Sequence, residues 1–358
     1  LEERHNNKPT DSMIDTQSAG TAATAPCQPR SAQEWTRILL NYRTPSNGRS
    51  VFEIFVTFVP FVALWSLTWA AVHFGYWQLL AVLWLLAAGF LVRLFLIQHD
   101  CGHGSFFRHR TTNDWIGRAL GVLTLTPYDT WRHAHAIHHS TTGHLEQRGI
   151  GDIDTLTVSE YKALSWRGRL RYRAYRHPLT MFVVGPAYMF LVRHRLPAGM
   201  LKCHWTGWFS TMATNLAIAV VAVAFIWLVG VGPFLLVQLP ITLLAASIGV
   251  WLFYVQHQFE QTVWQHSDDW RLQDAALHGS SLYDLPGALL WLTANIGIHH
   301  VLHLCSRIPF YRLPKVLKDY PELKNVSRLT LLDSLACVRL TLWDKNRQKL
   351  VSFREAAA

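Results

Sequence analysis

Apolar residues in this chain are gathered into long blocks rather than spaced at the intervals of an amphipathic helix or strand. Four blocks, residues 54–74, 77–97, 208–229 and 234–255, are long enough to cross a hydrocarbon core of about 30 Å as helices. The connections after residues 74 and 229 are short and carry no charge, so each pair of blocks predicts a hairpin whose other ends lie on the same side of a membrane. The pattern predicts an all-α membrane protein with four transmembrane helices in two hairpins.

Shorter stretches flank these blocks. Residues 115–126 and 179–192 are too short to cross a bilayer, so we expect interfacial or re-entrant helices there. Residues 31–42 repeat apolar side chains at helical spacing, which predicts a short amphipathic helix on the membrane surface. Arg93 interrupts the second block near its end, where its side chain is expected to extend to the membrane surface. The basic, helix-compatible segment 312–358 is expected to complete a cytosolic, histidine-rich cap.

The composition agrees with a membrane protein. Half of the residues are hydrophobic, 16 are Trp and only 16% are charged. The formal charge of +10 does not indicate nucleic-acid binding, because the basic residues lie beside the apolar blocks, where membrane lipids and topology explain them. Between residues 108 and 176 there are eleven Lys and Arg against six Asp and Glu, and the positive-inside rule places this side, with both termini, in the cytoplasm. The five cysteines form no CxxC pair, which fits a reducing compartment.

The first 30 residues differ from the rest of the chain. They are polar and rich in Ala, Thr, Ser and Pro, which predicts disorder. The sequence begins at Leu1, and we expect translation to start at Met13. Residues 31–358 are expected to form one membrane domain.

Histidines gather at the edges of the apolar segments. Nine of the chain's 19 histidines lie there in four groups: His99 and His103; His135, His138 and His139; His257; and His299, His300 and His303. Spacings of three or four residues place side chains on one face of a helix, so members of a group can bind the same ion. One HxxxH pattern is common by chance, but its repetition on one side of the predicted membrane indicates a shared metal site.

The imidazole ligands limit which metal ions, and how many, the site can bind. A neutral imidazole is the commonest side-chain metal ligand, and eight or so imidazoles exceed the four positions of a tetrahedral zinc ion. We therefore expect two metal ions. Iron and zinc both accept nitrogen ligands, whereas Mg²⁺ and Ca²⁺ prefer oxygen. Iron beside a bilayer suits oxygen-dependent attack on C–H bonds, and zinc suits hydrolysis.

Four motifs resemble those of the membrane fatty-acid desaturases. They are His99-Asp-Cys-Gly-His103-Gly-Ser-Phe, His135-Ala-Ile-His138-His139 followed by Gly149-Ile-Gly-Asp152-Ile-Asp-Thr155, Gln256-His257-Gln-Phe-Glu260, and Asn295-Ile-Gly-Ile-His299-His300. The resemblance extends from about residue 35 through Ser306-Arg-Ile-Pro-Phe-Tyr-Arg-Leu-Pro314. It is greatest to the bacterial and cyanobacterial acyl-lipid branch related to delta-12 (omega-6) desaturases.

The resemblance implies a reaction and a site. A cytosolic di-iron centre, in a bacterial inner membrane, would use O₂ and two electrons to introduce a cis double bond into an acyl chain. The substrate would be an acyl-lipid or another acyl chain, and the electrons would come from a ferredoxin-type or b-type cytochrome partner. Carried over by position, the iron ligands are His99, His103, His135, His138, His139, His257, His299 and His303. His300 is a further candidate metal ligand, or a residue that orients one, and Asp100 and Asp152 are candidate acceptors for ligand N–H groups.

Position 302 departs from the family pattern, which has histidine at 302 and 303. This chain has Leu302, and leucine cannot bind iron. Three explanations remain open: His300 substitutes, one iron lacks a ligand and is held weakly, or the chain is a catalytically impaired paralogue. The same scaffold also leaves open a di-iron hydroxylase or ketolase acting on a lipid or carotenoid.

Overall fold

The computed structural model describes residues 30–149, 151–197 and 205–357, and those from Ala32 onward belong to one compact unit. The segment expected to be disordered lies outside the described residues apart from Arg30, as does the expected start at Met13.

Four long apolar helices carry the fold, as the hydrophobic pattern predicts. They are α2 (Asn47–His73), α3 (Leu80–His103, preceded by the 3₁₀ turn η2, Trp77–Leu79), α9 (Trp205–Val229) and α10 (Val231–His257). The Ser46 hydroxyl accepts a hydrogen bond from the backbone N–H of Arg49 and so caps the start of α2. Gly104 ends α3 with a φ of 67°, a left-handed conformation that glycine adopts without strain. The four predicted transmembrane segments in two hairpins are confirmed.

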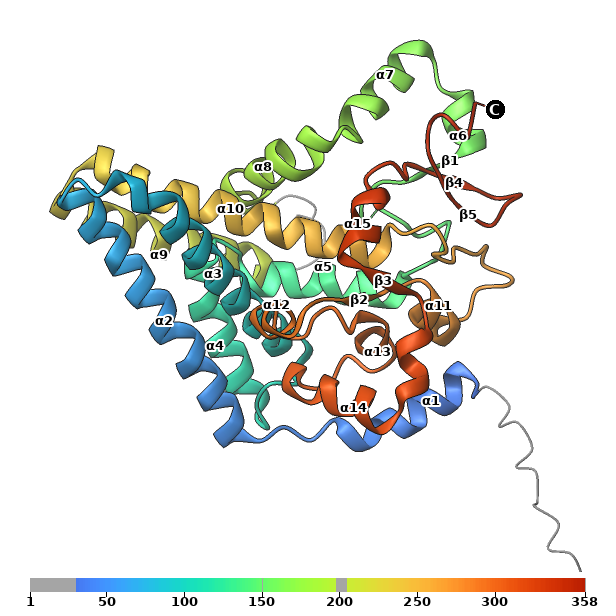
Figure 1. The fold of residues 1–358 in the computed structure, drawn as a ribbon, viewed down its shortest axis with the longest axis horizontal. Coiled ribbons are helices and arrows are strands. Elements are labelled where there is room, and N and C mark those ends of the chain that lie inside the picture. The colour runs from blue at the N-terminus through green and yellow to red at the C-terminus, as the bar shows by residue number, and fades with distance from the viewer. Residues whose placement is uncertain (1–29, 150, 198–204, 358) are drawn as a thin grey trace, which may run out of the picture. The chain divides into compact units, whose positions relative to one another are not determined.

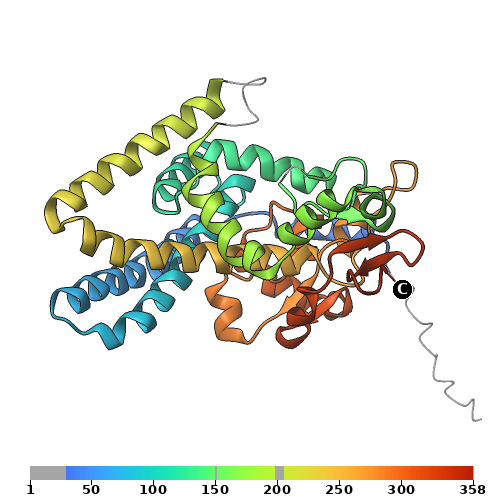
Figure 2. The ribbon, with the colours of Figure 1, turned by 90° about the horizontal axis from the view of Figure 1, so that it is seen from above.

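The packing of these helices separates a lipid-facing surface from an interior. α3 packs against both α2 and α10, and α9 packs beside α10. Side chains such as Phe55, Val220 and Trp227 are apolar and exposed, as expected of helices that face lipid. Both hairpin turns lie at one end of the bundle, on the left in Figure 1 and Figure 2, so α3 and α10 end together on the opposite side.

Arg93 does not extend to the membrane surface, contrary to the expectation from sequence. Its guanidinium is buried and lies 2.6 Å from the carboxylate of Glu53, which is buried on α2. It also donates to the hydroxyl of Thr57 at 3.0 Å and lies over the indole of Trp291. Because the two charges neutralise one another inside the bundle, the arginine has no need to reach water.

Shorter helices pack against the bundle without crossing it. α4 (Arg110–Leu123) and α5 (Tyr128–Thr141) each pack against α3 and α9. The π-helical turn η3 (Thr180–Val184) and α8 (Gly185–Leu191) pack against α10. All are too short to span a bilayer, in agreement with the predicted interfacial helices.

The first helix has the predicted amphipathic pattern but a different partner. In α1 (Ala32–Leu39), which continues into η1 (Leu40–Tyr42), the side chains of Trp35 and Leu39 are buried. The helix packs against α11 (Leu272–His278) and α13 (His299–Leu304). The expected placement of its apolar face on the membrane surface is therefore wrong, because periodicity shows that a face is buried but not what covers it.

Residues 258–357 form a cap of short elements over the ends of α3 and α10. Besides α11 and α13 it contains α12 (Gly287–Leu292), η5 (Phe310–Arg312), α14 (Leu313–Asp319), η6 (Pro321–Asn325) and α15 (Leu331–Cys337). The segment between α5 and α9 adds α6 (Val158–Ala163), α7 (Trp166–Tyr175) and η4 (Arg193–Arg195).

Two small sheets complete the cap, and the hydrophobic pattern does not predict them. β2 (Leu282–Asp284) pairs in parallel with β3 (Arg328–Thr330). β4 (Leu342–Asp344) pairs in parallel with β1 (Leu156–Thr157) and antiparallel with β5 (Lys349–Val351). The tail is thus only partly helical, and strands of two or three residues are too short to show an alternating pattern.

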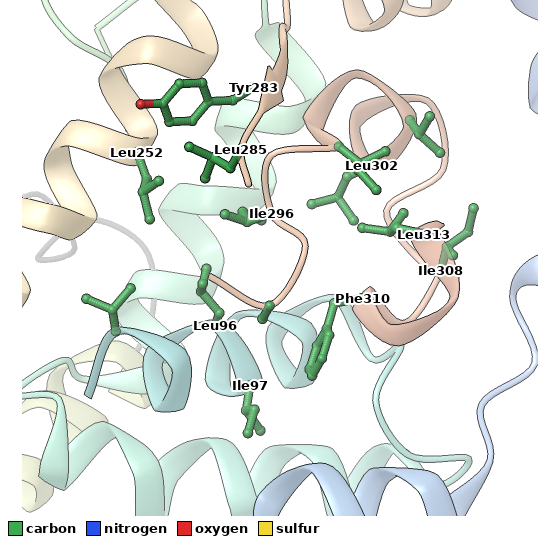
Figure 3. Close-up of a cluster of buried hydrophobic side chains, with 14 of the residues drawn as sticks. Leu96, Ile97, Leu252, Tyr283, Leu285, Ile296, Leu302, Ile308, Phe310 and Leu313 are labelled. Atoms are coloured by element: carbon green, nitrogen blue, oxygen red, sulfur yellow. The ribbon is translucent and has the colours of Figure 1, made fainter. Parts of the chain in front are cut away.

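A buried apolar cluster joins the bundle to the cap. Figure 3 shows Leu96 of α3 and Leu252 of α10 beside Tyr283, Leu285 and Ile296 of the cap. Burying a large apolar side chain contributes about 1.5–3 kcal/mol. The cap is therefore held firmly against the helix ends that carry the histidines.

Candidate metal centre

The first histidine group joins the end of α3 to α5. His99 and His103 lie one turn apart on α3, and His135 and His139 lie one turn apart on α5. The Nε2 atom of His135 is 2.9 Å from that of His99, 3.2 Å from that of His103 and 3.1 Å from that of His139. All four ligand atoms lie within 4.8 Å of one another. Two helical pairs on packed helices thus converge on one point.

The second group draws on three segments that are distant in the sequence. It consists of His138 on α5, His257 at the end of α10, and His299 and His303 on α13. Nε2 of His257 lies 3.2 Å from that of His138 and 3.0 Å from that of His299, which is 3.1 Å from Nε2 of His303. All four side chains are buried. They meet because α5, α10 and the cap pack together at the same end of the bundle.

The two groups adjoin each other. α5 contributes to both because His138 and His139 are consecutive, and the ring of His139 stacks on that of His303 with 4.0 Å between centroids. The structure therefore brings together all eight histidines that the motifs single out as ligands. Within the described ranges, no cysteine or carboxylate joins either group.

The nitrogen positions fit bound metal ions. Imidazole nitrogens that bind one ion at about 2.0–2.1 Å lie about 2.9–3.4 Å apart in octahedral or tetrahedral geometry. The closest separations in the first group, 2.9–3.3 Å, fall in this range. A neutral imidazole has only one N–H, so converging Nε2 lone pairs repel unless protons or a cation lie between them. The eight imidazoles fit two metal ions, one in each group, and the metal must be one that accepts nitrogen ligands.

Four of the imidazoles outside the membrane-spanning helices are kept neutral by their surroundings. Desolvation lowers the pKa of His135, His139, His299 and His303 well below its usual value. Neighbouring imidazoles lower these pKa values further, because adjacent positive charges would repel. The neutral form is the one that binds metals.

Asp152 orients one ligand of the second group. Nδ1 of His138 lies 2.5 Å from Oδ1 of Asp152. A carboxylate only accepts hydrogen bonds, so Nδ1 carries the proton and Nε2 keeps its lone pair for the centre. The loop approaches α5 closely at Gly151, whose φ is 72° and where a Cβ would lie 3.0 Å from the Ala134 carbonyl oxygen. Glycine at this position therefore lets Asp152 reach the histidine.

Asp100 has a different main partner. Its Oδ1 lies 3.4 Å from Nδ1 of His99, whereas its Oδ2 accepts a hydrogen bond from the backbone N–H of Phe310 at 2.7 Å. Asp100 mainly ties the end of α3 to the cap.

His300 and Leu302 lie outside both groups. Nε2 of His300 donates to the carbonyl oxygen of Leu323 at 3.0 Å and so ties α13 to η6. Leu302 is 1% exposed and belongs to the apolar cluster that Figure 3 shows with Ile308 and Leu313. His300 does not take the place of a ligand at position 302, and each group has four imidazoles without either residue.

Trp131 is a supporting residue that the sequence reasoning missed. Its indole stacks on the ring of His135, with centroids 4.6 Å apart and 17° between the planes. Its position one turn before His135 is a signal that could have pointed to it.

Arg176 is a second missed residue. Its buried guanidinium donates to the hydroxyl of Thr155 at 3.1 Å, to the side-chain carbonyl of Gln258 at 2.9 Å and to the backbone carbonyl of Leu340 at 2.9 Å. It thus connects the loop after α5, the residue that follows His257 and the C-terminal segment. One arginine in a basic stretch gives no sequence signal for such a role.

Comparison with known proteins adds an independent line of evidence. Residues 76–327 match the profile of the fatty acid desaturase family. A fatty acid desaturase of Bacillus subtilis (strain 168) is 45% identical over 323 residues, which cover 90% of this chain and 91% of the relative. Two proteins of Synechocystis sp. are more distant. The sn-1 acyl-lipid omega-3 desaturase (ferredoxin) is 28% identical, and the match covers 68% of this chain and 67% of the relative. The sn-1 oleoyl-lipid 12-desaturase is 26% identical, and the match covers 69% of this chain and 72% of the relative.

The matched segment contains both histidine groups. The Bacillus relative aligns along nearly the whole chain, so the likeness is not confined to short histidine motifs. The chain therefore belongs to the fatty acid desaturase family and is an oxidoreductase of lipid metabolism.

Proposed function

We propose that the chain is an acyl-lipid desaturase that introduces a cis double bond with two irons, O₂ and two electrons. The meeting of two four-imidazole groups at the common end of α3 and α10 carries the proposal. Family membership supports desaturation, and the relative named a 12-desaturase supports the delta-12 (omega-6) position. Other relatives are named omega-3 desaturases, so the position is the part of the proposal that product analysis has to decide.

Each iron has its own set of four ligands in this proposal. We assign one to His99, His103, His135 and His139, and the other to His138, His257, His299 and His303. A bound pair of irons supplies the O₂ chemistry needed to break unactivated C–H bonds. The reaction balances as –CH₂–CH₂– with O₂, two electrons and two protons giving –CH=CH– and two waters. The protein's own part is to hold neutral Nε2 atoms in place, as Asp152 does for His138.

The position of the centre suits a substrate that lies in the bilayer. Both groups lie where α3 and α10 end, on the side opposite the hairpin turns. The basic excess between residues 108 and 176 supports a cytoplasmic placement of this side, and of both termini, in a bacterial inner membrane. Relatives named as ferredoxin-dependent support a ferredoxin-type electron donor, with a b-type cytochrome as the alternative.

Leu302 favours a second candidate function, an impaired paralogue that binds metal without turnover. The two groups of four imidazoles weigh against it, because neither needs a ligand from position 302. A hydroxylase or ketolase would use the same centre and differs only in its product.

Fatty-acid analysis of an expressing host tests the proposal. We expect the wild type to produce new unsaturated species, with the double-bond position read from dimethyl disulfide adducts by mass spectrometry. His138→Ala should abolish them. His133→Ala is the matched control, because His133 is an exposed residue on the same helix outside both groups.

Iron analysis separates the alternatives. The purified wild type should hold about two irons per chain, as two groups of four imidazoles require. Hydroxylated or oxidised lipids in place of olefins would identify a hydroxylase or ketolase. Two bound irons with no product, in a host that supplies the electron donor, would identify an impaired paralogue.

A further inference from the structure

A pocket separate from the histidine groups lies between α6, α7 and the C-terminal segment. Its lining residues are Tyr161, Lys162, Trp166, Arg169, Leu170, Arg173, Phe353, Ala356 and Ala357. Its volume is ≈ 450 Å³, which is in the range of small-molecule sites. Cationic and aromatic side chains therefore surround a space large enough for a phosphate-bearing group.

The arginines of this pocket make contacts that leave their charge uncompensated. Arg173 donates from Nε to the hydroxyl of Tyr161 at 2.7 Å and lies 5.1 Å from the centre of the Phe353 ring. Arg169 donates to the backbone carbonyls of Lys162 and Leu164. Among the described residues, neither arginine nor Lys162 forms an ion pair.

The nearby carboxylates are engaged elsewhere. Glu160 pairs with Arg148 and caps α6 through Thr157. Glu355 accepts hydrogen bonds from the backbone N–H and hydroxyl of Ser352. Three cations line the pocket, and Glu355 is the one of these two nearby carboxylates that no cation pairs with among the described residues, so the pocket keeps a net positive field that favours an anion.

Apolar side chains lie on the same face of α7 as Arg169 and Arg173. Trp166 and Leu170 are one turn apart, both line the pocket, and they are 70% and 61% exposed. Exposed Trp and Leu interleaved with Arg on one helix face are typical of a helix at a membrane interface. An acidic protein partner would use the cations but would not require the exposed apolar pair.

The chain places this face at the edge of the membrane-contacting surface. η3 and α8, which follow α7, pack against the transmembrane helix α10. Leu179, Val183 and Tyr188 in that segment are nevertheless exposed. Figure 1 shows α7 extending from α8 away from α10. The pocket thus lies just beyond an exposed apolar surface, at the position where lipid phosphates are expected.

We propose that this pocket binds the phosphate of an anionic phospholipid headgroup. Lys162, Arg169 and Arg173 contact the phosphate, and Trp166 and Leu170 contact the apolar layer beneath it. The site needs neither iron nor desaturation, and comparison of pocket variants separates its test from binding of an acyl-lipid at the histidine groups.

Lipid retention by the full-length protein tests the proposal. The protein is purified in a neutral detergent and equilibrated with equal amounts of phosphatidylglycerol and phosphatidylcholine, and bound lipids are counted by native mass spectrometry. The wild type should retain phosphatidylglycerol in preference. Arg169→Gln/Arg173→Gln should weaken this retention about 30-fold, the effect of removing two cations beside an anionic lipid.

A matched double variant controls for charge alone. Arg167→Gln/Arg171→Gln removes the same charge from the same helix at residues that do not line the pocket, and its retention should stay within about threefold of the wild type. Because Arg173 also holds Tyr161, Lys162→Gln is a further variant. It should weaken retention about fivefold without changing the thermal unfolding midpoint.

Three results would overturn the proposal. Equal retention of the two lipids by the wild type would show that no anionic headgroup is selected. Equal losses in the two double variants would show only a diffuse charge effect. Unchanged lipid retention together with weaker binding of an acidic ferredoxin in Arg169→Gln/Arg173→Gln would assign the pocket to a protein partner instead.

Discussion

The carboxylate of Asp152 lies 2.5 Å from Nδ1 of His138 and so couples the loop after α5 to the second histidine group. His138 is fully buried, and its Nε2 faces that of His257 at 3.2 Å. The hydrogen bond therefore fixes both the tautomer and the ring orientation of an imidazole that belongs to α5 but faces α10. A carboxylate behind a ligating histidine in this way fixes the ring and raises its basicity as a metal ligand.

Asp152→Asn should weaken iron binding or activity about 10- to 100-fold, the usual effect of removing a carboxylate behind a histidine ligand. Iron retained per chain during chelator challenge, together with product formation, measures the effect. Asp154→Asn is the control, since Asp154 is exposed two residues further along the same loop. Equal iron loss in the two variants would contradict the role of Asp152.

Neighbouring histidines on α13 should behave differently. His299→Ala removes an imidazole from the second group and should lower iron content toward one per chain, with loss of product. His300→Ala leaves both groups intact but removes the hydrogen bond to the Leu323 carbonyl, which keeps only the longer one from the Val326 N–H at 3.4 Å. The loss should cost about 0.5–1.5 kcal/mol of unfolding free energy. Metal analysis and thermal unfolding of both variants test this separation. Loss of iron from His300→Ala, in protein that remains folded, would show that His300 acts as a ligand.

The sequence was sufficient to predict the four long apolar helices and the histidines that the fold brings together, and each has a physical basis. Long apolar blocks report directly on the bilayer, so α2, α3, α9 and α10 were predictable. Spacings of three and four residues identify side chains that share a helix face. They do not say which imidazoles share an ion. His138 and His139 are consecutive yet belong to different groups, and this partition depends on how α5 packs against α3, α10 and the cap.

Other features escaped prediction because they depend on contacts between distant segments. The pairing of Arg93 with Glu53 follows from the packing of α3 against α2, which hydropathy does not describe. The partner of Trp35 lies in the C-terminal half, where its ring meets that of Tyr320. Amphipathic spacing marks such a side chain as buried, but the partner is known only from the fold.

The Glu53 and Arg93 pair should show strong energetic coupling. Glu53→Gln leaves the buried Arg93 guanidinium without a counter-charge and should lower the unfolding free energy by about 3–5 kcal/mol. Arg93→Met should lower it less, because Arg49 still pairs with Glu53 at 2.7 Å. The double variant should lose much less than the sum, because it leaves no uncompensated charge. The double-mutant cycle is completed by measuring the unfolding free energies of the wild type, the two single variants and the double variant in mixed detergent micelles. Additive losses would show that the two side chains do not stabilise each other.

Leu302→His should not increase the iron content. Both histidine groups already contain four imidazoles, and the leucine lies in an apolar cluster where an imidazole lacks partners. We expect about two irons per chain in both proteins and a loss of about 1–3 kcal/mol in unfolding free energy for the variant. A clear rise in iron content or turnover would instead show that position 302 supplies a missing ligand.

Arg176 should control the second group through the segments that it joins. Arg176→Gln cannot reach Thr155, Gln258 and Leu340 together, so hydrogen bonds that contribute about 0.5–1.5 kcal/mol each are lost. Gln258 and Leu340 keep their hydrogen bonds from the hydroxyls of Thr155 and Tyr254. Because Gln258 follows His257 and Thr155 lies in the loop of Asp152, the loss should also speed iron release from the second group. The effect is measured as the rate of iron release after a chelator is added, with the release of the first and the second iron of each chain followed separately.

Two comparisons distinguish this positioning role from a general loss of stability. Arg171→Gln removes the same charge at an exposed position on α7, the helix that Arg176 caps, and should release iron at the wild-type rate. Arg176→Lys keeps the charge but lacks the planar guanidinium that serves several acceptors at once. Its rate of iron release from the second group should therefore lie between those of the wild type and Arg176→Gln. If Arg176→Gln lowers the unfolding temperature while both irons leave at the wild-type rate, the arginine stabilises the cap without positioning His257.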